Sequence, residues 1–155
     1  MSEVTVTEVK AQVVVGIWKR GTYAEIDPMI AKVREYAESS GARILGRPTF
    51  ICHERPREAM KAHEEASADV EVVIAVSKPV KGMEDITCYE LLGGRMAKIV
   101  HKGPYEKSAA AYKKLFKWIA DNHKKVVGPT REVYLNDPRK VAPEEILTEI
   151  YAPIA

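Results

Sequence analysis

The stretch that decides the fold reads Arg131-Glu132-Val133-Tyr134-Leu135-Asn136-Asp137-Pro138. Val, Tyr and Leu favour a β-strand, and Asn-Asp-Pro favours a turn that ends the strand. Alternate residues of a strand share one face of a sheet. Glu132 and Tyr134 are therefore predicted to point the same way. That face is either an ordinary solvent-exposed surface, or an interior one that holds a carboxylate beside an aromatic ring.

The composition is typical of one soluble globular domain with a hydrophobic core, because 46% of the 155 residues are hydrophobic and 30% are charged. The net charge of +2 is too small to indicate binding to nucleic acid or to an anionic membrane surface. No apolar run approaches the ~20 residues of a membrane span, and the start does not have the pattern of a signal peptide. We therefore expect a cytoplasmic protein that does not contact membranes.

Cysteine and histidine usage gives no reason to expect a metal or a cofactor. Cys52 and Cys88 lack the spacing of metal ligands and are predicted to be free thiols. The four histidines of the chain also show no metal-ligand spacing.

Hydrophobic periodicity predicts the main elements. Between about Ile26 and Ser39 apolar residues recur every three or four positions, which predicts an amphipathic helix that Gly41 ends. A second helix is predicted from about Glu106 to Asn122. Strands are predicted at residues 12–18, 49–53, 69–76, 87–92 and 96–101, with shorter candidates at 4–10 and 43–45. Residues 56–67 are charged and are predicted to form a loop.

The second half of the chain repeats the first. Four landmark residues recur 82 positions later: Gly21 as Gly103, Tyr23 as Tyr105, Gly46 as Gly128 and Pro56 as Pro138. Further on, residues 69–76 match residues 147–154 at an offset of 78, so the loop of the second half is four residues shorter. The paired tyrosines are expected to anchor equivalent turns.

We therefore predict an α+β fold made of two β-α-β-β units, residues 12–80 and 96–155, within a single domain. The units are expected to be related by pseudo-twofold symmetry, with antiparallel sheets and a ligand cleft between them.

Four motifs of the second half resemble those of a known family: residues 102–106 (Lys-Gly-Pro-Tyr-Glu), 128–134 (Gly-Pro-Thr-Arg-Glu-Val-Tyr), 136–138 (Asn-Asp-Pro) and 147–154 (Leu-Thr-Glu-Ile-Tyr-Ala-Pro-Ile). In this order they resemble the GyrI-like effector-binding family. The resemblance implies a duplicated β-α-β-β fold. It is found in the drug-sensing part of multidrug regulators, in gyrase inhibitors and in hydrolases of cyclopropane-bearing alkylating toxins. Because the domain uses up the chain, we expect a stand-alone member.

The resemblance also implies a site. It places the family's buried pocket glutamate on Glu132, its strand neighbour on Tyr134, and a second acidic and aromatic pair on Glu149 and Tyr151. The offset of 82 matches Glu132 to Phe50, so a position that is apolar in one half is acidic in the other. If Phe50 faces inward, as a wall of the cleft, Glu132 does too.

Each candidate has an ordinary alternative. Glu132 could be a surface residue opposite a lysine. Glu149 and its repeat mate Glu71 are both acidic and could form a solvated symmetric feature. Tyr112 and Trp118 are candidates for the ligand site, although aromatic residues at helical spacing are more often part of the core.

Three classes of function fit these residues. The first is binding of a hydrophobic aromatic molecule, including cations and electrophilic toxins. The second is hydrolysis, in which Glu132 acts on water and Tyr134 or Tyr151 polarises a conjugated carbonyl. The third is interaction with a protein such as gyrase through the lysine-rich second helix. A haem-binding function by analogy with the SOUL family is weaker, with His53 and His101 as the candidate axial ligands.

Overall fold

The computed structural model describes residues 3–155 and divides into two compact units. Unit 1 comprises the described residues up to Val9 together with Gly94–Ala155, and unit 2 comprises Lys10–Gly93. The chain therefore leaves unit 1 after its first strand and returns to it for the second half of the sequence. The predicted α+β class with antiparallel sheets is confirmed in both units.

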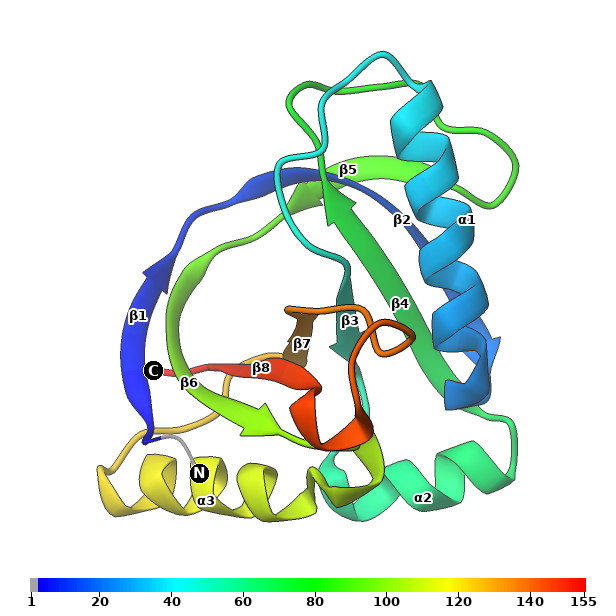
Figure 1. Ribbon diagram of the computed structural model, residues 1–155. Helices are drawn as coiled ribbons and strands as arrows, with labels where there is room; N and C mark the ends of the chain where they lie inside the picture. The colour runs from blue at the N-terminus through cyan, green and yellow to red at the C-terminus, as the bar shows by residue number, and fades with distance from the viewer. Residues whose placement is uncertain (1–2) are drawn as a thin grey trace. The chain divides into compact units, whose positions relative to one another are not determined.

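Unit 2 has four antiparallel strands in the order β3-β4-β2-β5. Its elements in chain order are β2 (Gln12–Gly21), the 3-10 turn Tyr23–Glu25, α1 (Ile26–Ser39), β3 (Thr49–Cys52), α2 (Pro56–Glu64), β4 (Ala68–Ala75) and β5 (Thr87–Leu91). Helix α1 packs along β4 and β2 (Figure 1).

Helix α1 has the bounds that the sequence predicts. It buries Met29, Val33 and Ala37, which are spaced by four and so lie on one face of the helix. Gly41 follows the helix with a φ of +86°, a left-handed conformation that glycine adopts without steric cost.

Helix α2 lies where the sequence predicted a loop, and that prediction was wrong. Ala, Met, Lys, Arg and Glu within residues 57–64 are strong helix formers, and Pro56 takes the first helical position, where its missing N–H costs least. The many charges concealed this preference. The matching stretch of unit 1, four residues shorter, holds only the 3-10 turn Pro143–Glu145.

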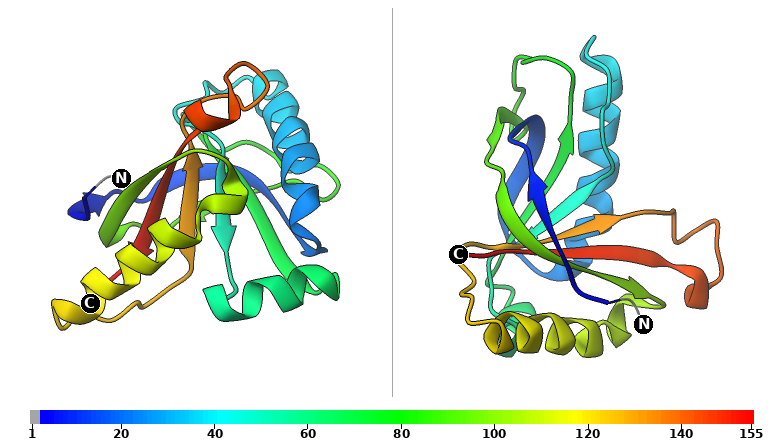
Figure 2. Two further views of the ribbon diagram at one scale, coloured as in Figure 1. Left: turned by 60° about the horizontal axis from the view of Figure 1, so that its bottom comes forward. Right: turned by 90° about the vertical axis from the view of Figure 1, so that its left-hand side faces the viewer.

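Unit 1 has four antiparallel strands in the order β1-β6-β8-β7. Its elements in chain order are β1 (Thr5–Val9), β6 (Gly94–Lys102), the 3-10 turn Tyr105–Lys107, α3 (Ala109–Asp121), β7 (Thr130–Tyr134), the 3-10 turn Pro143–Glu145 and β8 (Leu147–Pro153). Figure 2 shows α3, in yellow, lying against one side of this sheet.

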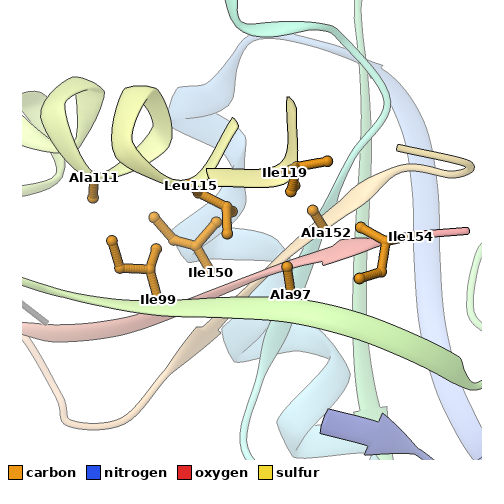
Figure 3. Packing of buried hydrophobic residues seen from close by; sticks show 8 residues of the cluster. All are labelled: Ala97, Ile99, Ala111, Leu115, Ile119, Ile150, Ala152 and Ile154. Atoms are coloured by element: carbon orange, nitrogen blue, oxygen red, sulfur yellow. The ribbon is translucent and has the colours of Figure 1, made fainter. Parts of the chain in front are cut away.

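The core of unit 1 lies between α3 and the sheet. Helix α3 contributes Ala111, Leu115 and Ile119, again spaced by four, and Figure 3 shows Leu115 pointing toward Ile150. The other core residues come from β6, β8 and the residue that follows β8: Ala97, Ile99, Ile150, Ala152 and Ile154. We call the side of the sheet that these residues occupy the helix face, and the opposite side the second face.

Candidate functional site

Strand register places Glu132 and Tyr134 on the helix face of unit 1. Directly opposite residues of paired strands point to the same side of a sheet. Glu132 lies opposite Ile150, a core residue beneath α3, and Tyr134 lies opposite Thr148. The predicted shared orientation of Glu132 and Tyr134 is therefore confirmed, and their side is the one that the helix covers.

The Glu132 carboxylate is held by two tyrosines. Tyr112, from α3, donates its hydroxyl hydrogen to Oε2, and Tyr134 donates to Oε1 at 3.2 Å. Tyr112 also packs against the core cluster, with its ring stacked on Phe116 at 6.3 Å between centroids. One residue thus joins the hydrophobic core of unit 1 to the buried end of the carboxylate.

The surroundings of Glu132 disfavour its charge. Burial raises the pKa of Glu132, while the hydrogen bonds from Tyr112 and Tyr134 and the interaction with His101 oppose this rise. Burial, together with the negative charge of Glu132, also raises the pKa of Tyr134 well above its ordinary value. Tyr134 is therefore a neutral hydroxyl donor, and Glu132 is a carboxyl group whose protonation responds to what lies beside it.

Two further side chains complete this site. The ring of Tyr105 meets that of Tyr134 edge to face at 5.4 Å between centroids. The Nε2 atom of His101 lies 2.9 Å from the carbonyl oxygen of Pro104. Since a carbonyl oxygen only accepts, Nε2 carries the hydrogen. We call the group Glu132, Tyr134, Tyr112, Tyr105 and His101 the Glu132 site.

The Gly-Pro-Tyr motif explains how Tyr105 reaches this site. Gly103 has a φ of +124°, which turns the chain sharply after β6 and is strained for any other residue. The same turn brings the carbonyl of Pro104 to His101. The sequence predicted that Tyr105 anchors a turn; the structure adds its contact with Tyr134.

Glu149 and Tyr151 lie on the second face of the same sheet. Glu149 and Tyr151 alternate with Ile150 along β8, so their side chains point to the opposite side of the sheet from Ile150. Their partners on β7 are Val133 and Arg131. Glu149 forms an ion pair with Lys98 at 2.6 Å and accepts a hydrogen bond from Tyr151 at 3.1 Å. The hydrogen bond to Glu149 raises the pKa of Lys98. The sequence prediction grouped these residues with Glu132; the structure separates the two pairs by the thickness of the sheet.

The other two candidates pack in or against the hydrophobic cores of the two units. Trp118, on α3, packs against the core cluster of unit 1 and is partly buried. Phe50 belongs to unit 2, where it is 3% exposed and meets Tyr23 edge to face at 5.8 Å between centroids.

Unit 2 holds a buried carboxylate that the sequence analysis missed. Glu71 is 4% exposed, so the solvated alternative is wrong for this residue. Its Oε1 atom lies 2.7 Å from Nε2 of His53, and its Oε2 accepts a hydrogen bond from Tyr89 at 2.5 Å. Trp18, which is opposite Glu71 on β2, stacks on His53 at 4.4 Å between centroids. The parity of β4 was a usable signal, because Glu71 shares its face of the strand with the apolar residues Val73 and Ala75, which are both buried.

Within residues 3–155, no group of three or more His, Cys, Asp or Glu side chains is arranged to hold a metal ion. No helix in the described part of the chain is both long enough and apolar enough to cross a membrane.

The chain belongs to the GyrI-like small-molecule-binding domain family, whose sequence profile matches residues 2–155. The resemblance that the four motifs indicated is therefore confirmed. No curated protein sequence matches the chain.

Solved structures share the fold. The C-terminal domain of EcmrR is 20% identical with a TM-score of 0.87, over 100% of this chain and 98% of that one. EcmrR in its complex with DNA is 21% identical with a TM-score of 0.84, over 99% of this chain but only 57% of that one. This chain therefore spans little more than half of EcmrR.

Two other structures are more distant. A hydrolase encoded by lin2189 from Listeria innocua is 12% identical with a TM-score of 0.71, over 99% of this chain and 92% of that one. SAV2435 bound to tetraphenylphosphonium is 13% identical with a TM-score of 0.63, over 99% and 94%. At these identities the likeness concerns the fold alone.

We predict that Glu132→Gln changes how stability depends on pH. Because burial raises the pKa of Glu132 above its ordinary value of 4.5, the folded wild type binds this proton more tightly than the unfolded chain. The stability that this bound proton contributes is fully present below pH 4.5 and is lost as the pH rises through the raised pKa of Glu132. Glutamine does not titrate, so the stability of Glu132→Gln does not fall in this way. The free energy of unfolding of Glu132→Gln relative to wild type, measured in urea, should therefore increase between about pH 4.5 and pH 7.5.

Glu106→Gln, at an exposed glutamate of the same unit, is the control for the background. A difference between Glu132→Gln and wild type that stays constant over this range would contradict the burial of Glu132.

Proposed function

We propose that the Glu132 site binds an aromatic cation. The observation that carries this proposal is a contrast between three carboxylates. Glu149 pairs with Lys98, and Glu71 lies against His53. None of the ion pairs formed among residues 3–155 includes Glu132, which is held by neutral hydroxyls. A partly buried carboxylate that forms no ion pair attracts a cation that a guest supplies.

The aromatic residues of the site fit the same kind of guest. The rings of Tyr105, Tyr112 and Tyr134 offer apolar area and electron-rich faces, which attract a cation held within about 6 Å of the ring centroid. A cation beside Glu132 would also favour the carboxylate form and so reverse the rise in its pKa. The fold shared with SAV2435, which is bound to tetraphenylphosphonium, supports this choice of guest.

We also propose that units 1 and 2 arose by internal duplication. Unit 2 has the order β3-β4-β2-β5 and unit 1 has the corresponding order β7-β8-β6-β1, with α1 and α3 following equivalent strands. The offset of 82 relates Phe50 to Glu132 at equivalent positions of β3 and β7. A polar site in unit 1 then corresponds to an apolar position in unit 2, which supports a function specific to unit 1.

We expect Glu132→Gln to weaken binding of tetraphenylphosphonium by roughly 1 to 3 kcal/mol, the Coulomb energy of a carboxylate and a cation about 6 Å apart at an effective dielectric constant of about 20 to 40. Binding of triphenylphosphine oxide, a neutral relative, should change little. Isothermal titration calorimetry of both compounds with wild type and variant tests this. Glu149→Gln, at the ion-paired carboxylate on the second face, is the matched control and should leave phosphonium affinity almost unchanged. Equal weakening by Glu132→Gln and Glu149→Gln, or by neither, would contradict the proposal.

Hydrolysis of a strained electrophile is the second candidate function. A carboxylate beside a tyrosine hydroxyl is the observation that favours it, and the Listeria innocua hydrolase has the same fold. In this mechanism Glu132 removes a proton from water as the water oxygen bonds to a cyclopropane carbon and the ring bond breaks. Tyr134 donates a hydrogen bond to the carbonyl oxygen, where negative charge develops, and the ring-opened carbon is finally protonated. Both Glu132 oxygens accept from tyrosines here, so Tyr134 has to turn toward the substrate, and binding is the better supported function.

Turnover has a direct test. Incubation with a cyclopropane-bearing alkylator should give the ring-opened water adduct by mass spectrometry, at a rate that Glu132→Gln reduces by about 10²-fold or more. Tight binding with no adduct above the uncatalysed background would reject hydrolysis and leave the binding function.

A further inference from the structure

Thr148 has a buried hydroxyl without a partner beside the Glu132 site. The residue lies on β8 and is 2% exposed. Among the described residues its Oγ1 atom is the one buried side-chain oxygen or nitrogen atom for which no hydrogen bond is formed. On the helix face its direct neighbours are His101 on β6 and Tyr134 on β7. Directly opposite side chains have Cβ atoms about 5 Å apart, so the side chain of Thr148 lies between those of His101 and Tyr134.

The fold does not require this hydroxyl. An unpaired buried hydroxyl destabilises a protein, whereas an apolar group of the same shape does not. At the offset of 78, the equivalent residue of unit 2 is Val70, which is 0% exposed. Valine differs from threonine by a methyl group in place of the hydroxyl. The same strand position therefore packs well without an oxygen, and the hydroxyl of Thr148 calls for an explanation other than packing.

The hydrogen-bond donors next to Thr148 already have acceptors within the protein. The hydroxyls of Tyr112 and Tyr134 donate to Glu132, and Nε2 of His101 donates to the carbonyl of Pro104. A guest or a water molecule that presents an oxygen atom here would find the hydroxyl of Thr148 as an uncommitted donor.

We propose that Thr148 is a specificity-determining residue whose hydroxyl donates a hydrogen bond to an oxygen atom from outside the protein. This oxygen belongs either to a buried water molecule or to a hydroxyl, carbonyl or ether group of a bound aromatic guest. The proposal rests on the proposed binding function of the Glu132 site. If the oxygen is the guest's, aromatic guests that carry a hydroxyl, carbonyl or ether oxygen bind more tightly than those that carry none.

The test uses two variants of Thr148 and one control. Thr148→Val removes the hydroxyl and keeps the shape, and Thr148→Ser keeps the hydroxyl. Val70→Thr introduces a hydroxyl at the equivalent buried position of unit 2. It measures how far an unpartnered hydroxyl lowers the melting temperature there.

Thermal unfolding without a guest distinguishes the two sources of oxygen. If a water molecule is bound, Thr148→Val loses that hydrogen bond and should melt about 2 to 4 °C below wild type. If the oxygen comes only from a guest, Thr148→Val should melt at the same temperature as wild type or higher, because it loses an unpaired polar atom. Val70→Thr should melt lower in either case.

Calorimetric binding tests the guest. Tetraphenylphosphonium lacks an oxygen, and its analogue with one para-hydroxymethyl group carries one. We expect wild type and Thr148→Ser to bind the analogue about 3- to 10-fold more tightly, relative to tetraphenylphosphonium, than Thr148→Val does. Affinity for tetraphenylphosphonium itself should be the same in all three proteins.

The proposal is overturned if Thr148→Val is as stable as wild type or more stable and also binds both phosphonium compounds as wild type does. If neither compound binds any of the proteins, the proposed function fails for this class of guest, and the unfolding experiment alone decides about Thr148. A lowered melting temperature then supports the bound water, and an unchanged or raised one overturns the proposal.

Discussion

A carboxylate on the helix-covered face of a sheet has to be hydrogen-bonded, because an unpartnered charge there would destabilise the fold by several kcal/mol. In unit 1 two hydroxyls meet this requirement for Glu132, one from α3 and one from the same strand. Tyr112 reaches the carboxylate because Leu115 and Ile119 fix α3 on the sheet. The same packing that holds α3 on the sheet therefore also positions the Tyr112 hydroxyl at the Glu132 carboxylate.

Glu149, Glu71 and Glu132 differ in what holds them. Lys98 neutralises Glu149, and the imidazole of His53 lies against Glu71. Glu132 accepts hydrogen bonds from the neutral hydroxyls of Tyr112 and Tyr134, and burial raises its pKa. A carboxylate whose charge is already neutralised by an ion pair attracts a cationic guest weakly. A carboxylate that is held by hydroxyls can instead pair with the cation of a guest. This difference in partners distinguishes Glu132 from Glu149 and Glu71.

Much of this arrangement could be predicted from the sequence. Helix α1 and most strands follow from periodicity, and the alternation in residues 131–138 predicts that Glu132 and Tyr134 share a face. The separation of Glu149 and Tyr151 from them was also encoded, since Ile150 and Ala152 of β8, and Ile154 just after it, occupy alternate positions and belong to the core. Family motifs grouped residues by sequence position and overlooked this parity. Helix α2 was missed because its charged residues concealed a strong helix propensity. The unpartnered hydroxyl of Thr148 could not be predicted, because it depends on where every neighbouring hydrogen points.

The protonation of Glu132 can be observed directly by NMR of the protein with ¹³C-labelled glutamate carboxyl groups, using Glu132→Gln to assign the resonance. We expect the Glu132 resonance to titrate above the ordinary glutamate pKa of 4.5, since burial disfavours its charge. Addition of tetraphenylphosphonium should move this titration to lower pH, because a neighbouring cation favours the carboxylate. A resonance that titrates in the ordinary glutamate range and does not respond to the phosphonium would contradict the role of Glu132 as the buried counter-charge for a guest.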